Sequence, residues 1–198
     1  MSYVELIVVL GIFSVVSAVS LYNYGDFQAR VDIKNLASDF ALKIVEAQKS
    51  SLSGLLPPPA QEALIPAQTE SGQPFFWKPS YGIYLEPASN NQSFVYFVDL
   101  NNNNLYDSVD CTEECLNKIT FTKNYAISDL RVFYQNNDPS PNSLHDLTVS
   151  FSRINSGATM RSSTEFSSAV SYVQITISSP DGIKAIIKLY PSGRVQMN

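Results

Sequence analysis

The sequence predicts an α+β fold in which one long N-terminal helix packs against an antiparallel β-sheet. Residues 2–53 contain no proline and only two glycines, which favours an uninterrupted helix. Beyond residue 75 the chain divides into short segments rich in β-branched and aromatic residues, separated by turn residues. A helix followed by consecutive strands, rather than strands alternating with helices, is typical of α+β domains.

The first half of this helix is apolar. Residues 3–22, YVELIVVLGIFSVVSAVSLY, are apolar or small except for Glu5, and about 20 such residues span a bilayer as a helix. A secretory signal peptide would begin with basic residues and end at a small-residue cleavage site. This run has no basic residue and continues into a further helical pattern. We therefore expect residues 1–25 to be a retained transmembrane helix.

The second half, residues 26–54, is amphipathic. Apolar residues recur at roughly helical spacing and predict one face that packs on the sheet; they are Phe27, Val31, Leu36, Phe40, Ile44 and Ala47. Gly54 and the prolines at 57–59 end the helix. At about 1.5 Å per residue the helix is roughly 80 Å long. A domain of this size cannot bury such a rod, so its first half must be covered by lipid or by other subunits. Gly25 and the polar residues around it mark an expected bend or melting point.

Residues 55–198 form the expected β-rich head. A loop rich in Pro, Gln and Ala is expected at 55–74, and a polar exposed loop at 155–168. The expected strands are 75–85, 93–100, 118–122, 130–135, 146–153, 172–178 and 183–190, with a further short one at 194–197.

Glu5 is the only charged residue of the apolar run. A lone carboxylate at the centre of a membrane helix costs about 2.5–3.5 kcal/mol on insertion scales, and such residues usually have a partner and a function. No Lys or Arg precedes Arg30. The remaining positive group is a chain N-terminus, either that of the same chain or that of a neighbouring copy.

Composition and motifs exclude several classes of protein. The net charge is −5 and the 13 basic residues are scattered, which argues against nucleic acid as the main partner. The chain has one histidine, His145, without the context of a nucleophilic triad, and no glycine-rich phosphate loop. Glu113 and Glu114 are interpreted as solvated charges. We therefore expect no enzymatic activity and no catalytic residue.

Residues 99–110, DLNNNNLYDSVD, have the spacing of a calcium loop. Oxygen-bearing side chains occur at positions 1, 3, 5, 9 and 12, and position 7 would supply a backbone carbonyl. The candidate ligands are Asp99, Asn101, Asn103, Leu105, Asp107 and Asp110. Asn104 replaces the usual glycine, and Asn tolerates positive φ. The alternative is an Asn-rich turn with solvated aspartates.

Cys111 and Cys115 lie four residues apart, directly after this loop. A short disulfide is expected in an oxidising compartment, with one helical turn bringing the two Cα atoms close together. Free thiols and a metal site are the alternatives. A zinc site would need further ligands, and only His145 could join the two cysteines.

The N-terminal sequence MSYVELIVVLGIFSVVSAVSLYNY resembles the mature start of type IV pilins and pseudopilins, over roughly residues 1–53. In that family a basic leader is cleaved and a glutamate stands fifth, as Glu5 does here, although Met1 occupies a place usually taken by Phe. Shorter stretches are similar to type II secretion minor pseudopilins and related minor pilins: residues 35–48, Tyr81-Gly82-Ile83, the Asp/Asn stretch and residues 189–195.

The resemblance implies the pilin fold and a subunit of a type IV pilus-like filament. Prepilin peptidase would already have removed the leader, and an assembly platform in the cytoplasmic membrane would then add the subunit to a polymer of itself or of other pilins. Glu5 would pair with the N-terminus of Met1 on a neighbour. The filament core would contain Val4, Leu6, Ile7, Val8, Val9, Leu10, Ile12 and Phe13. Before assembly the subunit is expected in the cytoplasmic membrane, with its head outside the cytoplasm. After assembly it is expected in a filament on the cell surface.

Two other functions stay open. The first is a minor pseudopilin that primes or tips a secretion pseudopilus. The second is a DNA-binding pilin, for which the C-terminal region offers only Lys184, Lys188 and Arg194, little charge for binding phosphates. The later, shorter stretches of resemblance favour the minor class, but we expect a filament that serves adhesion, surface motility or cell contact.

Overall fold

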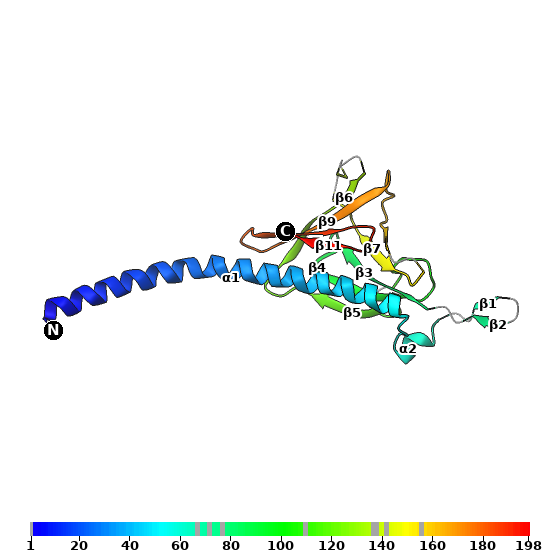
Figure 1. Cartoon of the computed structure of the whole chain (residues 1–198), viewed down its shortest axis with the longest axis horizontal. Helices are drawn as coiled ribbons and strands as arrows, with labels where there is room; N and C mark the ends of the chain where they lie inside the picture. Colours follow the sequence, from blue (N-terminus) through cyan, green and yellow to red (C-terminus); the bar gives the residue numbers. More distant parts are fainter. Residues whose placement is uncertain are drawn as a thin grey trace.

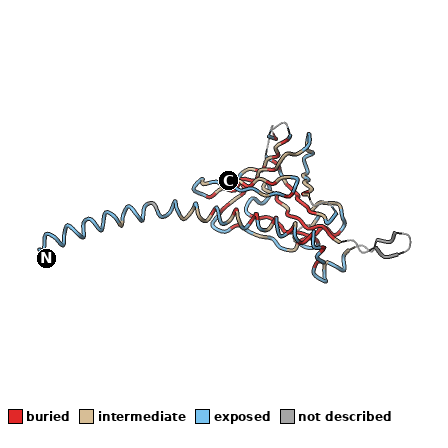
Figure 2. Tube along the Cα trace, in the orientation of Figure 1, coloured by how far each residue is buried: buried red, intermediate tan, exposed pale blue. Residues whose placement is uncertain are grey.

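A long helix extends from a head built of two antiparallel sheets (Figure 1). The computed structural model describes residues 2–65, 68–70, 73–75, 78–108, 111–135, 139–140, 143–154 and 157–198. The predicted α+β class is confirmed. Among the described side chains the buried ones begin at Ile33, and the N-terminal part of the helix is exposed along its length (Figure 2). The core of the head therefore does not depend on the first part of the helix.

Helix α1 (Tyr3–Ser53) is continuous, as predicted. It runs through Gly25 without interruption, and the helix curves along its length (Figure 1). It ends at Gly54, whose φ of 61° is left-handed and whose N–H donates to the carbonyl of Ser51. Glycine adopts this conformation without a steric penalty, which explains why the helix stops at this position.

The larger sheet has the strand order β5-β4-β3-β7-β8 and the smaller one β11-β10-β9-β6. Their neighbouring strands pair antiparallel. The larger sheet comprises β5 (Cys115–Thr120), β4 (Asn90–Asp99), β3 (Ser80–Glu86), β7 (Leu147–Phe151) and β8 (Ala158–Arg161). The smaller comprises β11 (Val195–Met197), β10 (Lys184–Leu189), β9 (Val170–Ser178) and β6 (Ala126–Tyr134).

Two segments that were expected to be loops contain regular structure. Residues 55–74 include a short helix, α2 (Pro59–Glu62), and most of a hairpin formed by β1 (Gln68–Glu70) and β2 (Gln73–Phe75). Residues 155–168 include β8, which pairs with β7 at the edge of the larger sheet. Both loop predictions were therefore wrong. β8 is an edge strand with one buried residue, Ala158, and its sequence has too little apolar periodicity to be recognised as a strand.

The second half of α1 packs on strands of both sheets, chiefly β3, β7 and β10. Its buried face is formed by Ile33, Ala37, Phe40, Ala41, Ile44 and Ala47. Three of the six residues predicted for this face are buried, whereas Val31 and Leu36 are half-buried and Phe27 is 64% exposed. The prediction was wrong for Phe27 because the helical pattern of apolar residues extends further toward the N-terminus than the part of α1 that the sheets cover.

Hydrogen bonds fix the C-terminal end of α1 on the larger sheet. The Ser51 hydroxyl accepts the N–H of Tyr81 at 2.8 Å and donates to the carbonyl of Phe151, thereby linking the helix to β3 and β7. Next to Tyr81, a Cβ on Gly82 would lie 2.3 Å from the carbonyl oxygen of Val149. Only glycine fits at that position, which keeps β3 in close contact with its neighbour.

Candidate functional site

Most of the exposed large apolar side chains among the described residues lie in the first half of α1. The eight residues predicted for a filament core are between 48% and 68% exposed; they are Val4, Leu6, Ile7, Val8, Val9, Leu10, Ile12 and Phe13. They project on all sides of the helix because they are nearly consecutive in sequence. A helix that is apolar all round requires lipid or protein around it.

By length and composition α1 is also a candidate membrane span, and within the described residues it is the one such helix. Its most apolar window has a mean hydropathy of 2.4 and contains no buried residue. The head, in contrast, packs on the second half of the helix, with Ile33 as the first buried residue among those described. The chain therefore combines a potential membrane anchor with a separately packed head.

Glu5 lies in the first turn of α1 and is exposed. Its backbone N–H donates to the carbonyl of Ser2 at 3.0 Å. An acidic side chain in the first turn is favourable, because the N-terminal end of a helix carries partial positive charge. Met1, the predicted partner on a neighbouring copy, lies outside the described residues.

The predicted calcium loop is organised around Asp99, whose side chain is completely buried. Its carboxylate accepts backbone N–H groups from Asn102, Asn103 and Asn104, at 2.6, 3.3 and 2.9 Å. Asn102 and Asn104 both have a φ of 62°, so the positive φ predicted for Asn104 is confirmed. Burial raises the pKa of Asp99 despite these N–H contacts.

Three further predicted ligands converge on the exposed side of the loop. Asp107 accepts the amide group of Asn101 at 2.9 Å, and it also accepts that of Asn103. Among the described residues, no group of three His, Cys, Asp or Glu side chains is placed to hold a metal ion. Asn101 and Asn103 direct their amide N–H groups at Asp107, while their side-chain oxygens accept the backbone N–H groups of Asn103 and Leu105 at 3.1 and 2.7 Å. Asp110 lies outside the described residues.

Glu114, which was predicted to be a solvated charge, closes the same loop. It is 4% exposed, and its carboxylate accepts the N–H of Leu100 at 3.1 Å and the N–H of Asp107 at 3.0 Å. Burial is the main reason that its pKa is raised, with a contribution from the negative charges of Asp99 and Asp107. No periodic pattern surrounds Glu114 in the sequence, so nothing there distinguished it from exposed Glu113.

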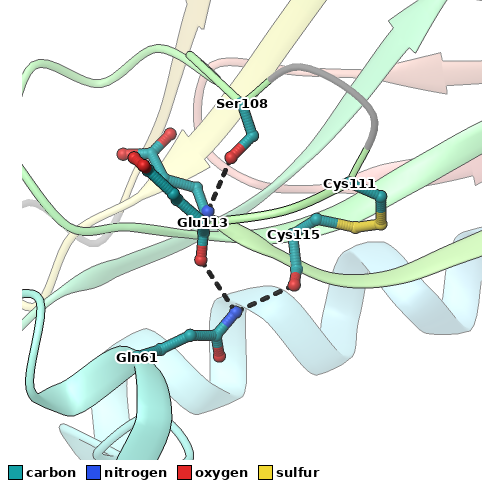
Figure 3. Close-up of a disulfide and its surroundings, with 6 residues drawn as sticks. Gln61, Ser108, Cys111, Glu113 and Cys115 are labelled. Carbon is teal, nitrogen blue, oxygen red and sulfur yellow. Dashed lines mark hydrogen bonds between the residues drawn. A yellow bond between two sulfur atoms is a disulfide. The ribbon is translucent and has the colours of Figure 1, made fainter.

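The predicted disulfide between Cys111 and Cys115 is present, with the two Cα atoms 4.7 Å apart. The segment between them is not the predicted helical turn, because Cys115 is the first residue of β5. Gln61 of α2 donates to the carbonyls of Glu113 and Cys115, at 3.0 and 2.8 Å (Figure 3). The disulfide therefore joins the two ends of this segment, and Gln61 links the segment to α2.

Two of the three basic residues considered for DNA binding contact aromatic rings on the smaller sheet. The Lys188 ammonium lies 4.9 Å from the ring centre of Tyr172, and the Arg194 guanidinium lies 4.0 Å from that of Tyr190. Lys184 is exposed at the start of β10. The two cation–π contacts hold both charges against the sheet.

No family model matches the chain, and no curated protein or solved structure is significantly similar to it. The resemblance of residues 1–53 to pilins therefore stays a prediction.

Proposed function

We propose that this chain is the structural subunit of a type IV pilus-like filament with a pilin fold. The observation that carries the proposal is the division of α1: its second half belongs to the core of the head, whereas its first half is apolar and exposed. Before assembly, the first half would lie in the cytoplasmic membrane. In the filament, the same half would be surrounded by the first halves of neighbouring copies.

Burial of apolar side chains favours transfer of the first half of α1 from water into lipid or into a bundle of helices. Burial of an exposed Val, Leu, Ile or Phe side chain stabilises by about 1.5–3 kcal/mol. The eight predicted core residues are already partly shielded by the helix backbone, so their complete burial contributes on the order of 10 kcal/mol per subunit. That contribution is available in lipid and in a bundle of helices alike. Additional polar contacts are therefore needed to favour the bundle.

Glu5 would supply such a contact. We propose that its carboxylate pairs with the N-terminal amine of an adjacent subunit, at one end of the helix bundle. In the membrane the same carboxylate lacks a basic side chain nearby, because the first Lys or Arg of the sequence is Arg30. Pairing in the bundle removes this cost. Glu5 would thereby favour insertion into the filament and fix the position of each new subunit relative to the last.

Substitution of Glu5 tests this proposal. The variant Glu5→Ala should insert into the membrane and retain a folded head, because Glu5 lies far outside the core, yet filament yield should fall at least about tenfold. Electron microscopy of sheared surface material measures the yield. Ser2→Ala, at an exposed position in the same part of the chain, is the matched control. Normal yield of Glu5→Ala filaments would contradict the proposed pairing.

We propose in addition that the loop of residues 99–110 binds calcium through Asp99, Asn101, Asn103, Asp107, Asp110 and the carbonyl of Leu105. The spacing of these oxygen-bearing residues and the positive φ of Asn104 support this assignment. The two amide groups would have to turn so that their oxygens face the ion. Bound calcium would neutralise charge in a loop that already buries the carboxylates of Asp99 and Glu114.

A further inference from the structure

A cavity of about 300 Å³ lies where β6 ends, between the segments that follow β6 and β8. Its lining comes from Tyr134 at the end of β6, from residues between 140 and 145, and from residues between 164 and 167. Small-molecule sites occupy about 300–1,000 Å³, so this cavity has the size of a site for a small ligand. In Figure 1 β6 ends on the side of the head opposite α1, which places the cavity away from the proposed filament core.

Hydrogen bonds hold the first wall of the cavity against the edge of β6. The N–H groups of Ser140 and Leu144 donate to the carbonyls of Val132 and Leu130, both at 2.7 Å. The Ser143 hydroxyl also accepts the N–H of Leu130, at 3.0 Å. These three residues of the wall are therefore held in position before any ligand binds.

The second wall is attached to the head in a similar way. The carboxylate of Asp146 accepts the N–H of Ser163 at 2.9 Å and the hydroxyl of Ser162 at 3.2 Å, directly before the lining residues of this wall. At its far end the N–H of Ser167 donates to the Tyr134 hydroxyl at 3.4 Å. A cavity between two such walls is preformed, as small-molecule sites usually are.

The buried part of the lining is apolar except for one hydroxyl group. Tyr134 and Leu144 are 8% and 6% exposed. The Tyr134 hydroxyl accepts the N–H of Ser167, but among the described residues it has no acceptor for its own proton. A phenol both donates and accepts. A ligand oxygen in the cavity would therefore complete the hydrogen bonds of Tyr134.

Three exposed side chains supply further polar groups to the same cavity: the hydroxyl of Thr164, the carboxylate of Glu165 and the imidazole of His145. Within the part of the chain that the structure describes, none of these three side chains forms a hydrogen bond or an ion pair. A carboxylate accepts two hydroxyl groups at once, whereas a hydroxyl and a neutral imidazole each donate and accept. The group as a whole suits a ligand with several neutral hydroxyl groups.

We propose that this cavity binds a pyranose ring of a glycan. Such a ring has an apolar face that packs on an aromatic side chain, here Tyr134, and hydroxyl groups at its edge that Glu165, Thr164 and His145 would bind. Phosphorylated ligands fit poorly, because Glu165 would repel them. A second cavity of about 480 Å³ shares Thr164 and Glu165 with the first, which leaves room for a longer glycan chain.

The proposed glycan site goes beyond the proposed filament and does not depend on it. The site belongs to the head alone, and the first half of α1 contributes nothing to its lining. In a filament with the helices at its centre, the side of the head opposite α1 would lie outermost (Figure 1). A glycan on another cell would then have access to the cavity.

His145 allows a direct test, because it is the only histidine of the chain. Full-length protein, in a detergent without a sugar headgroup, is titrated with the methyl glycosides of glucose, galactose, mannose and N-acetylglucosamine while NMR records the ring signals of His145. At least one glycoside should shift them saturably, with a dissociation constant of about 0.1–1 mM for a ligand of this size. Glycerol should not shift them, because it has no ring to fill the cavity. No saturable shift with any of the four glycosides, or an equal shift with glycerol, would overturn the proposal.

Two substitutions test whether binding occurs in this cavity. Glu165→Ala removes the carboxylate and should raise the dissociation constant about tenfold, and Tyr134→Phe, which keeps the ring, should raise it about fivefold. Their controls are Glu113→Ala, at an exposed position elsewhere, and Tyr190→Phe, whose lost hydroxyl bonds to Gln196. Both controls should bind like wild type. Equal affinity of all four variants would refute the site, and because the protein is unassembled in this measurement, the result is independent of filament formation.

Discussion

A single hydroxyl, that of Ser51, joins the end of α1 to two strands of the larger sheet. It is completely buried, accepts the N–H of Tyr81 and donates to the carbonyl of Phe151. Nearby, the Tyr96 hydroxyl donates to the hydroxyl of Ser50 at 3.2 Å. These polar contacts determine where along the sheet the helix lies, because apolar packing alone would tolerate small shifts.

Ser51→Ala should lower the free energy of unfolding of the head by about 1–3 kcal/mol, since the N–H of Tyr81 would be left buried without a partner. Denaturant unfolding of residues 26–198, which contain every described buried side chain, measures this. Ser53→Ala is the control, because its hydroxyl bonds to the carbonyl of Ser50 within the same helix, and its effect should stay within about 0.5 kcal/mol. Equal effects of the two substitutions would contradict the role given to Ser51.

Tyr81 should make the head less stable in alkali. Burial, with a contribution from nearby Tyr96, raises the pKa of Tyr81 from 10.0 to about 12. Between these values the folded chain keeps a proton that the unfolded chain has lost, so the free energy of unfolding falls as pH rises from about 10 to 12. The loss reaches up to about 3 kcal/mol. Denaturant unfolding at pH 9 and 11 measures it, and Tyr81→Phe should reduce the difference. An unchanged difference in that variant would contradict the prediction.

Individual residues also show where sequence reasoning succeeds and fails. The αL conformations of Gly54 and Asn104 were predictable, because local chemistry dictates them. The burial of Glu114 was not, because it results from backbone N–H groups of Leu100 and Asp107 that folding alone brings to it. Long-range contacts of this kind leave no periodic signal in a sequence.

Among the elements, α1 was the most predictable and the short edge elements were the least. A pattern of 51 residues without proline fixes a helix, but it does not tell which apolar residues will meet a sheet. Phe27 and Leu42 are therefore exposed although both are large and apolar. The strands β1, β2 and β8 have three or four residues each and depend on pairing with their neighbours, which explains why their segments were interpreted as loops.

The loop between β4 and β5 should bind calcium with a dissociation constant of about 10⁻⁴ to 10⁻³ M, as is common in extracellular modules. Isothermal titration of residues 26–198 should show binding that Asp107→Asn abolishes, because the charge at the point of convergence is lost. Glu113→Gln, at an exposed position outside residues 99–110, should bind like wild type. Wild-type protein that takes up no calcium, or an Asp107→Asn variant that binds equally well, would exclude the site.

At the scale of the whole molecule, the chain consists of two parts that need different surroundings. The head buries its own core, whereas about half of α1 exposes apolar residues on all sides (Figure 2). Such a molecule is incomplete as a monomer in water. The proposed filament supplies the missing surroundings with further copies of the same helix, and Glu5 would determine how those copies are arranged.

The central claim is that copies of this chain bury their N-terminal helices in one another. Electron microscopy of the purified cell-surface fraction tests it most directly, with the protein identified by antibodies against the head. The account predicts long filaments in which this chain is the main component, its helices bundled at the centre and its heads outside. Absence of the chain from long filaments, or its presence only in trace amounts, would contradict the account.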